Sequence, residues 1–94
     1  MSKYFEKPLF IFEMANNHMG DVEHGLNMIR SFHDVAAPFG FQVAFKFQLR
    51  SIPEFIHPHF RDRMDIKYVK RFTETALSRS DFGRLHKEVK DLGM

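Results

Sequence analysis

The stretch PLFIFEMANNHMGDVEHGLNMIRSFHDVAAPFGFQVAFKFQ, from Pro8 to Gln48, decides the fold because its hydrophobic period changes along its length. It begins with Pro8–Phe12, a short apolar run followed by Glu13, which is typical of a strand buried on both faces, as parallel sheets require. It ends with residues 42–48, in which polar or small residues alternate with Val or Phe. This period of two predicts a second strand.

Between these strands the sequence predicts an amphipathic helix. Its apolar residues recur at helical spacing, at Val22, Leu26, Ile29, Phe32 and Ala36. Asp21 is a suitable N-cap, and Pro38 with Gly40 ends the pattern. A strand, a helix and a strand within about forty residues form a βαβ unit, whose right-handed crossover makes the two strands parallel.

The second half of the chain predicts a long connection and then two helices. Residues 49–65 contain two Pro and no sustained period, and such connections are uncommon unless they are functional or flexible. Residues 66–75 could form a short helix. A further helix begins after Ser78, with apolar residues at Phe82, Leu85, Val89 and Leu92 and with Gly93 at the C-cap position, after which another strand is expected.

Composition limits the class of protein. The 94 residues are 44% hydrophobic and 28% charged, as in globular proteins, and the 12 Phe need a thick core or a partner to cover them. The absence of Cys excludes disulfides and thiolate metal sites and favours the cytoplasm. Met1–Glu6 is no signal peptide, no run is long enough to span a membrane, and a net charge of +2 argues only weakly for nucleic acid. We expect neither nucleic-acid nor membrane partners.

Three polar side chains fall near the carboxyl ends of the predicted strands, where α/β barrels place their reacting groups. If the Phe faces, Phe10 and Phe12 on the first strand and Phe45 and Phe47 on the second, pack under the helices, then Glu13, Lys46 and Gln48 point towards the interior. A charge inside needs a partner, so Lys46 binds either an anion or simply the Glu13 carboxylate.

Histidines give weaker signals. His18, in the loop after the first strand, could bind substrate, or could be solvated or hydrogen-bonded to local backbone. His57 and His59 suggest a metal site but lack a third and fourth ligand nearby, so a solvated loop is the better interpretation, and we assign no metal ligand and no catalytic residue. The remaining histidines are expected on helix surfaces, at His24, His33 and His86.

Two motifs resemble those of a known family. FEMANNHMGD, Phe12–Asp21, resembles the first-strand motif of the sialic acid synthase family, in which a strand ending in Glu is followed shortly by Asn-His-x-Gly. FKFQ, Phe45–Gln48, resembles that family's second-strand Lys-Phe-Gln motif, and one amphipathic helix separates the two, as in the family. Ala76-Leu77-Ser78 is similar to the family's lead into its next helix.

The resemblance implies an α/β fold in which residues 1–94 are an incomplete N-terminal portion (strand, helix, strand, helix) of a (β/α)8 TIM barrel. It implies an N-acetylneuraminate synthase, a transferase that condenses phosphoenolpyruvate with an N-acyl amino sugar in carbohydrate biosynthesis, with Mn or Mg as cofactor and as a homo-oligomer. Lys46 would then hold the phosphoenolpyruvate anion, Gln48 and Glu13 would contact the sugar, and Asn17 and His18 would shape the sugar end of the site. The family's metal ligands lie on later strands, outside this chain.

The match is incomplete, and other functions remain open. Met14 and Phe41 stand where many relatives carry smaller residues, and the loop at residues 52–65 does not match closely, which leaves the sugar undefined. One alternative is a non-catalytic α/β module that associates through its open strand edges and Phe-rich surface. Another is a different barrel lyase or aldolase that binds phosphorylated substrates, although the Asn-His-x-Gly loop favours the synthase.

We therefore expect the 94-residue chain alone to be catalytically inactive and not to be a stable monomer, because a closed barrel needs roughly 250 residues and a two-stranded sheet is marginal by itself. Light scattering of the purified chain, combined with an assay for phosphoenolpyruvate condensation, tests this. A monomer that melts cooperatively and turns over substrate would contradict it.

Overall fold

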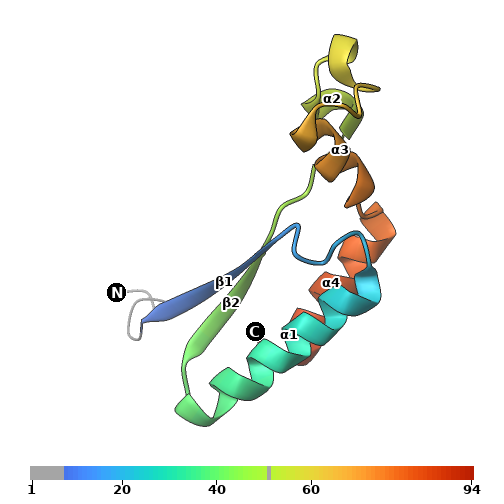
Figure 1. The fold of residues 1–94 in the computed structure, drawn as a ribbon. Helices are drawn as coiled ribbons and strands as arrows, with labels where there is room; N and C mark the ends of the chain where they lie inside the picture. The colour runs from blue at the N-terminus through green and yellow to red at the C-terminus, as the bar shows by residue number, and fades with distance from the viewer. Residues whose placement is uncertain (1–7, 51) are drawn as a thin grey trace.

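The computed structural model describes residues 8–50 and 52–94 as a mixed α/β chain (Figure 1). Its elements are, in order, β1 (Leu9–Ala15), α1 (Val22–Ala36), the 3-10 helix η2 (Ala37–Phe39), β2 (Gln42–Phe47), α2 (Ile52–Phe55), the 3-10 helix η3 (Pro58–Phe60), α3 (Lys67–Glu74) and α4 (Arg79–Asp91). In the described part of the chain, every helix is too short or too polar to cross a membrane. Residues 1–6, where we expect no signal peptide, lie outside the described residues.

β1 and β2 form a parallel two-stranded sheet, which confirms the predicted βαβ unit. Ile11 pairs with Ala44 and Glu13 with Lys46, and a bulge follows Glu13. β1 continues beyond the apolar run that predicted it, because the alternation continues: Glu13 faces away from the helices while Met14 is buried in the core.

α1 begins and ends where the sequence predicts. The Asp21 carboxylate accepts hydrogen bonds from the backbone N–H groups of Glu23 (2.9 Å) and His24 (3.3 Å), which satisfies two donors of the first turn. After α1 the chain passes through η2 and reverses at Gly40, whose φ of +67° lies in the left-handed region that glycine adopts readily.

α4 is the second helix of the core. It begins at Ser78, whose Oγ accepts a hydrogen bond of 3.0 Å from the Asp81 backbone N–H, and Gly93 (φ +85°) follows its end. α1 and α4 lie side by side on the same face of the sheet (Figure 1). The buried core lies between them and β1, at Met14, Leu26, Ile29, Leu85 and Val89.

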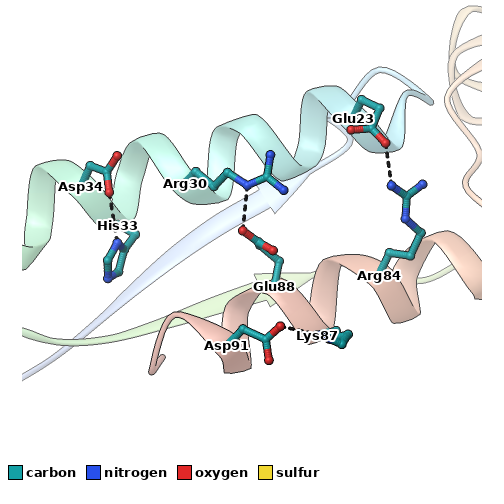
Figure 2. A network of polar contacts seen from close by, with 8 residues as sticks. All are labelled: Glu23, Arg30, His33, Asp34, Arg84, Lys87, Glu88 and Asp91. Atoms are coloured by element: carbon teal, nitrogen blue, oxygen red, sulfur yellow. Dashed lines mark hydrogen bonds and ion pairs between the residues drawn. The ribbon is translucent and has the colours of Figure 1, made fainter.

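Ion pairs join the outer surfaces of the two helices. Arg30 Nε lies 2.7 Å from Glu88 Oε1, and Arg84 Nη2 lies 2.5 Å from Glu23 Oε1 (Figure 2). Exposed pairs of this kind contribute little to the free energy of unfolding. The apolar contact beneath them therefore decides how the helices pack.

Three of the four strand phenylalanines expected under the helices lie there. The Phe12 ring is 5.2 Å from that of Phe32 on α1, and the rings of Phe45 and Phe47 join the same layer. Phe10 does not lie under a helix: it is 44% exposed and its ring packs 4.5 Å from that of Phe41, where the chain re-enters the sheet.

A glycine sets the separation of α1 and α4. A Cβ atom added to Gly25 of α1 would lie 2.9 Å from Leu85 Cδ2 and 3.3 Å from His18 Cβ. Leu85 is fully buried and has little room to move. Gly25 is therefore the position at which α4 and the loop after β1 both approach α1.

Replacing Gly25 with Ala should destabilise the protein relative to the same change at Gly83. Both glycines lie inside helices, so both gain helix propensity, but a Cβ at Gly83 meets nothing within 4 Å among the described residues. Overpacking should make Gly25→Ala less stable than Gly83→Ala by about 1–3 kcal/mol. Thermal unfolding of both variants measures the difference, and equal stabilities would mean that α4 moves away from α1 without cost.

Candidate functional site

The loop after β1 is tightly wound by backbone hydrogen bonds. Successive bonds of 3.0 Å run from the Asn17 N–H to the Met14 carbonyl, from Met19 to Asn16 and from Asp21 to His18. Ala15 (φ 50°) and Met19 (φ 60°) take the left-handed conformation that non-glycine residues seldom adopt. Such residues cluster at functional sites, where the surrounding structure holds them in place.

Gly20 closes this loop against α3. Its φ is +74°, and an added Cβ would lie 2.8 Å from the carbonyl oxygen of Glu74, at the end of α3. The loop and the carboxyl end of α3 are thus in direct backbone contact.

His18 is the buried centre of the loop. Its side chain is 3% exposed, its Nδ1 accepts a hydrogen bond of 3.0 Å from the Gly20 N–H, and its ring meets Phe82 edge-on at 6.0 Å. Burial lowers the pKa of His18 below its usual value, and repulsion from His24 lowers it further. Because Nδ1 is an acceptor, the neutral ring carries its proton on Nε2. Of the arrangements open from sequence, His18 thus shows the hydrogen bond to local backbone.

A small cavity adjoins His18. It has a volume of about 20 Å³, and its polar walls include Asn16, His18, Gln48, Arg50 and Thr75. This volume accommodates roughly one water molecule, so a substrate does not fit inside. The cavity brings the loop after β1, the end of β2 and the turn before α4 together.

Glu13 and Lys46 form an ion pair on the sheet face opposite α1 and α4. Lys46 Nζ lies 3.2 Å from Glu13 Oε1, and the two side chains are 57% and 59% exposed. The pairing that the sequence suggested is therefore present. The desolvation cost that motivated it does not apply, because in the described residues this face lies open to solvent. The Lys46 ammonium remains accessible to an anion.

An open groove lies beyond the end of β2. It has a volume of about 580 Å³ and is lined by Phe47, Gln48, Leu49, Arg50, Glu54 and Phe55. The groove is shallow and lies mostly open to solvent, so the described residues supply at most one wall of a small-molecule site. Gln48 and Arg50 line both this groove and the cavity beside His18, so they form the wall between them.

Arg50 is a polar residue of this region that was not predicted from the sequence. Its guanidinium lies 4.3 Å from the centre of the Phe72 ring and 5.4 Å from that of Phe55, and its Nη2 donates a hydrogen bond of 2.5 Å to Gln48 Oε1. The signal available in the sequence was the continued alternation of Lys46, Gln48 and Arg50 beyond the predicted strand.

Other candidates are placed differently. Asn17 is exposed and does not line the cavity, whereas Asn16 does. The rings of His57 and His59 lie 4.9 Å apart, and His57 Nδ1 accepts a hydrogen bond from the His59 N–H. Among residues 8–50 and 52–94, no three His, Cys, Asp or Glu side chains form a group that could hold a metal ion.

Comparison with solved structures identifies one informative similarity. The chain resembles the crystal structure of the putative spore coat polysaccharide biosynthesis protein E from Chromobacterium violaceum, with 51% sequence identity and a TM-score of 0.87. The similarity covers 94% of this chain and 26% of that chain, so this chain spans about a quarter of its relative's length. Neither a protein-family model nor a curated protein matches the sequence.

The lowered pKa of His18 predicts a loss of stability in acid. A group whose pKa is lower in the folded state binds protons more readily when the chain is unfolded. The contribution of neutral His18 to the free energy of unfolding is therefore fully present above pH ~6.5 and is lost as the pH falls below that value. His18→Asn keeps an acceptor near the Gly20 N–H but does not titrate. Denaturant unfolding at pH 8 and pH 5 should show a larger loss for the wild type than for this variant, and equal losses would contradict the prediction.

Proposed function

We propose that this chain forms one wall of the active site of a phosphoenolpyruvate-dependent synthase of the sialic acid synthase type, at the N-terminal part of a (β/α)8 barrel. Two motifs, at Phe12–Asp21 and Phe45–Gln48, support this proposal, as does the parallel strand-helix-strand unit that carries them. The similarity to a protein assigned to spore coat polysaccharide biosynthesis supports a role in sugar biosynthesis.

The Lys46 ammonium is the observation that carries the proposal. It lies near the carboxyl end of β2, on the sheet face opposite the helices, and is more than half exposed. A lysine ammonium is a compact point charge that binds phosphate and carboxylate groups, and phosphoenolpyruvate carries both. Glu13, its neighbour in the register, pairs with the ammonium at 3.2 Å, and because the Lys46 side chain is still 57% exposed an anion can reach it.

The groove beyond β2 suits the second reactant. It is open enough to admit an N-acyl amino sugar such as N-acetylmannosamine against one wall, and Gln48 in that wall would supply an amide to a polar group of the sugar. Glu13 could accept a hydrogen bond from a sugar hydroxyl. Condensation requires two reactants to be held in contact, and residues that position them lower the entropic part of the barrier.

The open sheet face supports an incomplete barrel. Leu9 and Ile11, on the same face as Glu13, are 47% and 56% exposed. In a closed barrel this face lines a packed interior, so further strands would cover these apolar side chains. The same exposure suits the second candidate, a non-catalytic module that associates through this face. The two differ in whether a change at Lys46 alters catalysis.

The divalent metal of such an enzyme, Mn or Mg, would polarise the sugar aldehyde as a Lewis acid. The described residues do not form its site, so its ligands would have to come from other parts of the enzyme. The contribution proposed for this chain is binding and positioning, by Lys46, Glu13 and Gln48. Assembly as a homo-oligomer in the cytoplasm belongs to the same proposal.

In the enzyme that contains this sequence, Lys46→Ala should lower apparent phosphoenolpyruvate affinity or turnover at least about tenfold, since a charge-assisted contact contributes ~1.5–3 kcal/mol. Lys90→Ala, on the exposed side of α4, is the matched control and should leave the kinetics unchanged. Steady-state kinetics with varied phosphoenolpyruvate measure the effect. Unchanged kinetics for Lys46→Ala would reject the assignment and favour the association module.

A further inference from the structure

The contact between Arg50 and Gln48 fixes which end of the Gln48 amide is already bonded and which end is free for a ligand. A guanidinium has donors and no acceptor, so the Gln48 atom 2.5 Å from Arg50 Nη2 has to be the amide oxygen. The amide nitrogen, with its two N–H donors, is then the free end of an amide that lines both the groove and the cavity beside His18. Without Arg50 either end of the amide could turn towards a ligand.

Arg50 is itself held in place from the other side. Its guanidinium lies over the Phe72 ring at 4.3 Å and near the Phe55 ring at 5.4 Å, so residues of α2 and α3 orient it. Among the residues that the structure describes, no carboxylate lies within ion-pair distance of Arg50. Its charge therefore acts on the Gln48 amide, whose N–H groups it polarises as donors.

We infer that Arg50 is a positioning residue, which locks the Gln48 amide so that its N–H groups donate to an acceptor oxygen of the bound substrate. The inference rests on the proposed function for the identity of that substrate. The inference adds a prediction about specificity: the substrate group that lies beside the Gln48 amide is a hydrogen-bond acceptor, such as a carbonyl, carboxylate or phosphoryl oxygen. A group that can only donate a hydrogen bond is disfavoured there.

A double-mutant cycle on the complete enzyme tests whether Arg50 acts through Gln48. Arg50→Met retains much of the apolar stem and removes the donors, and Gln48→Leu removes the amide. Each should raise the KM for one substrate about fivefold to tenfold with little change in kcat, and the double variant should be no worse than Gln48→Leu. Additive effects, or an unchanged KM for Arg50→Met, would overturn the inference.

Two further variants separate positioning from a merely structural role. Gln48→Glu keeps an acceptor for Arg50 and lacks the N–H donors, so its KM should rise as in Gln48→Leu while its melting temperature stays at the wild-type value or above. Arg50→Lys keeps a donor without the planar stacking and should restore part of the loss in Arg50→Met. Wild-type KM in Gln48→Glu, or no rescue by Arg50→Lys, would count against the mechanism.

An independent readout does not need the enzymatic reaction. In the complete enzyme, the side-chain NH₂ groups of the glutamines, Gln42 and Gln48 among them, can be followed by NMR after ¹⁵N-glutamine labelling, and the Gln48 signals can be assigned as those missing from Gln48→Leu. The Gln48 signals should be those of a restrained amide and should move to unrestrained values in Arg50→Met, while those of Gln42 stay. Unrestrained Gln48 signals in the wild type would overturn the inference whatever the activity. If the Gln48 signals are restrained but the complete enzyme does not condense phosphoenolpyruvate, the proposed function is rejected and the inference about Arg50 stands.

Discussion

The close approach of α1 and α4 at Gly25 is the constraint on which the rest of the structure depends. Leu85 fills the space that a side chain at this position would occupy, and His18 occupies the space beside it. Because one residue without a side chain accommodates both, the position of α4 and the path of the loop after β1 are coupled. The surface ion pairs between the helices follow from this packing and do not determine it.

That coupling extends to the polar groups at the end of the sheet. Buried His18 bonds to Gly20, Gly20 touches the end of α3, and α3 provides the Phe72 ring on which Arg50 lies. A continuous series of contacts thus runs from the helix pair to the wall of the groove. The left-handed residues of the loop are tolerated because both of its ends are held.

Local patterns in the sequence predicted the elements well, because their causes are local. The period of two and the period of 3.6 gave β1, β2, α1 and α4, and the caps at Asp21 and Ser78 lie where expected. The pairing of Lys46 with Glu13 was one of two options predicted from the shared strand face, and the register that places the two residues opposite each other brings it about. Features that depend on contacts distant in sequence were not predictable in this way.

Arg50 is one such feature, because its orientation depends on aromatic rings of two later helices. The position of Asn16 at the cavity is another, since it follows a left-handed residue, Ala15, at which the period of two ends. The placement of Phe10 against Phe41 depends on where the chain returns to the sheet. In each case the position of the side chain depends on the path of the chain through a loop, which the residue type alone does not reveal.

The distance in sequence between Gly25 and Leu85 has a consequence for folding during synthesis. The ribosome releases β1, α1 and β2 before α4, so the βαβ unit can form early from nearby segments. The Phe residues on its helix-facing side are covered to their final extent only after α4 has been synthesised. Until α4 has been synthesised, the surface of α1 around Gly25 and the Phe rings packed beside it are not covered. Nascent chains paused between β2 and α4 would therefore expose apolar side chains on both faces of the sheet, a surface that favours association with other chains.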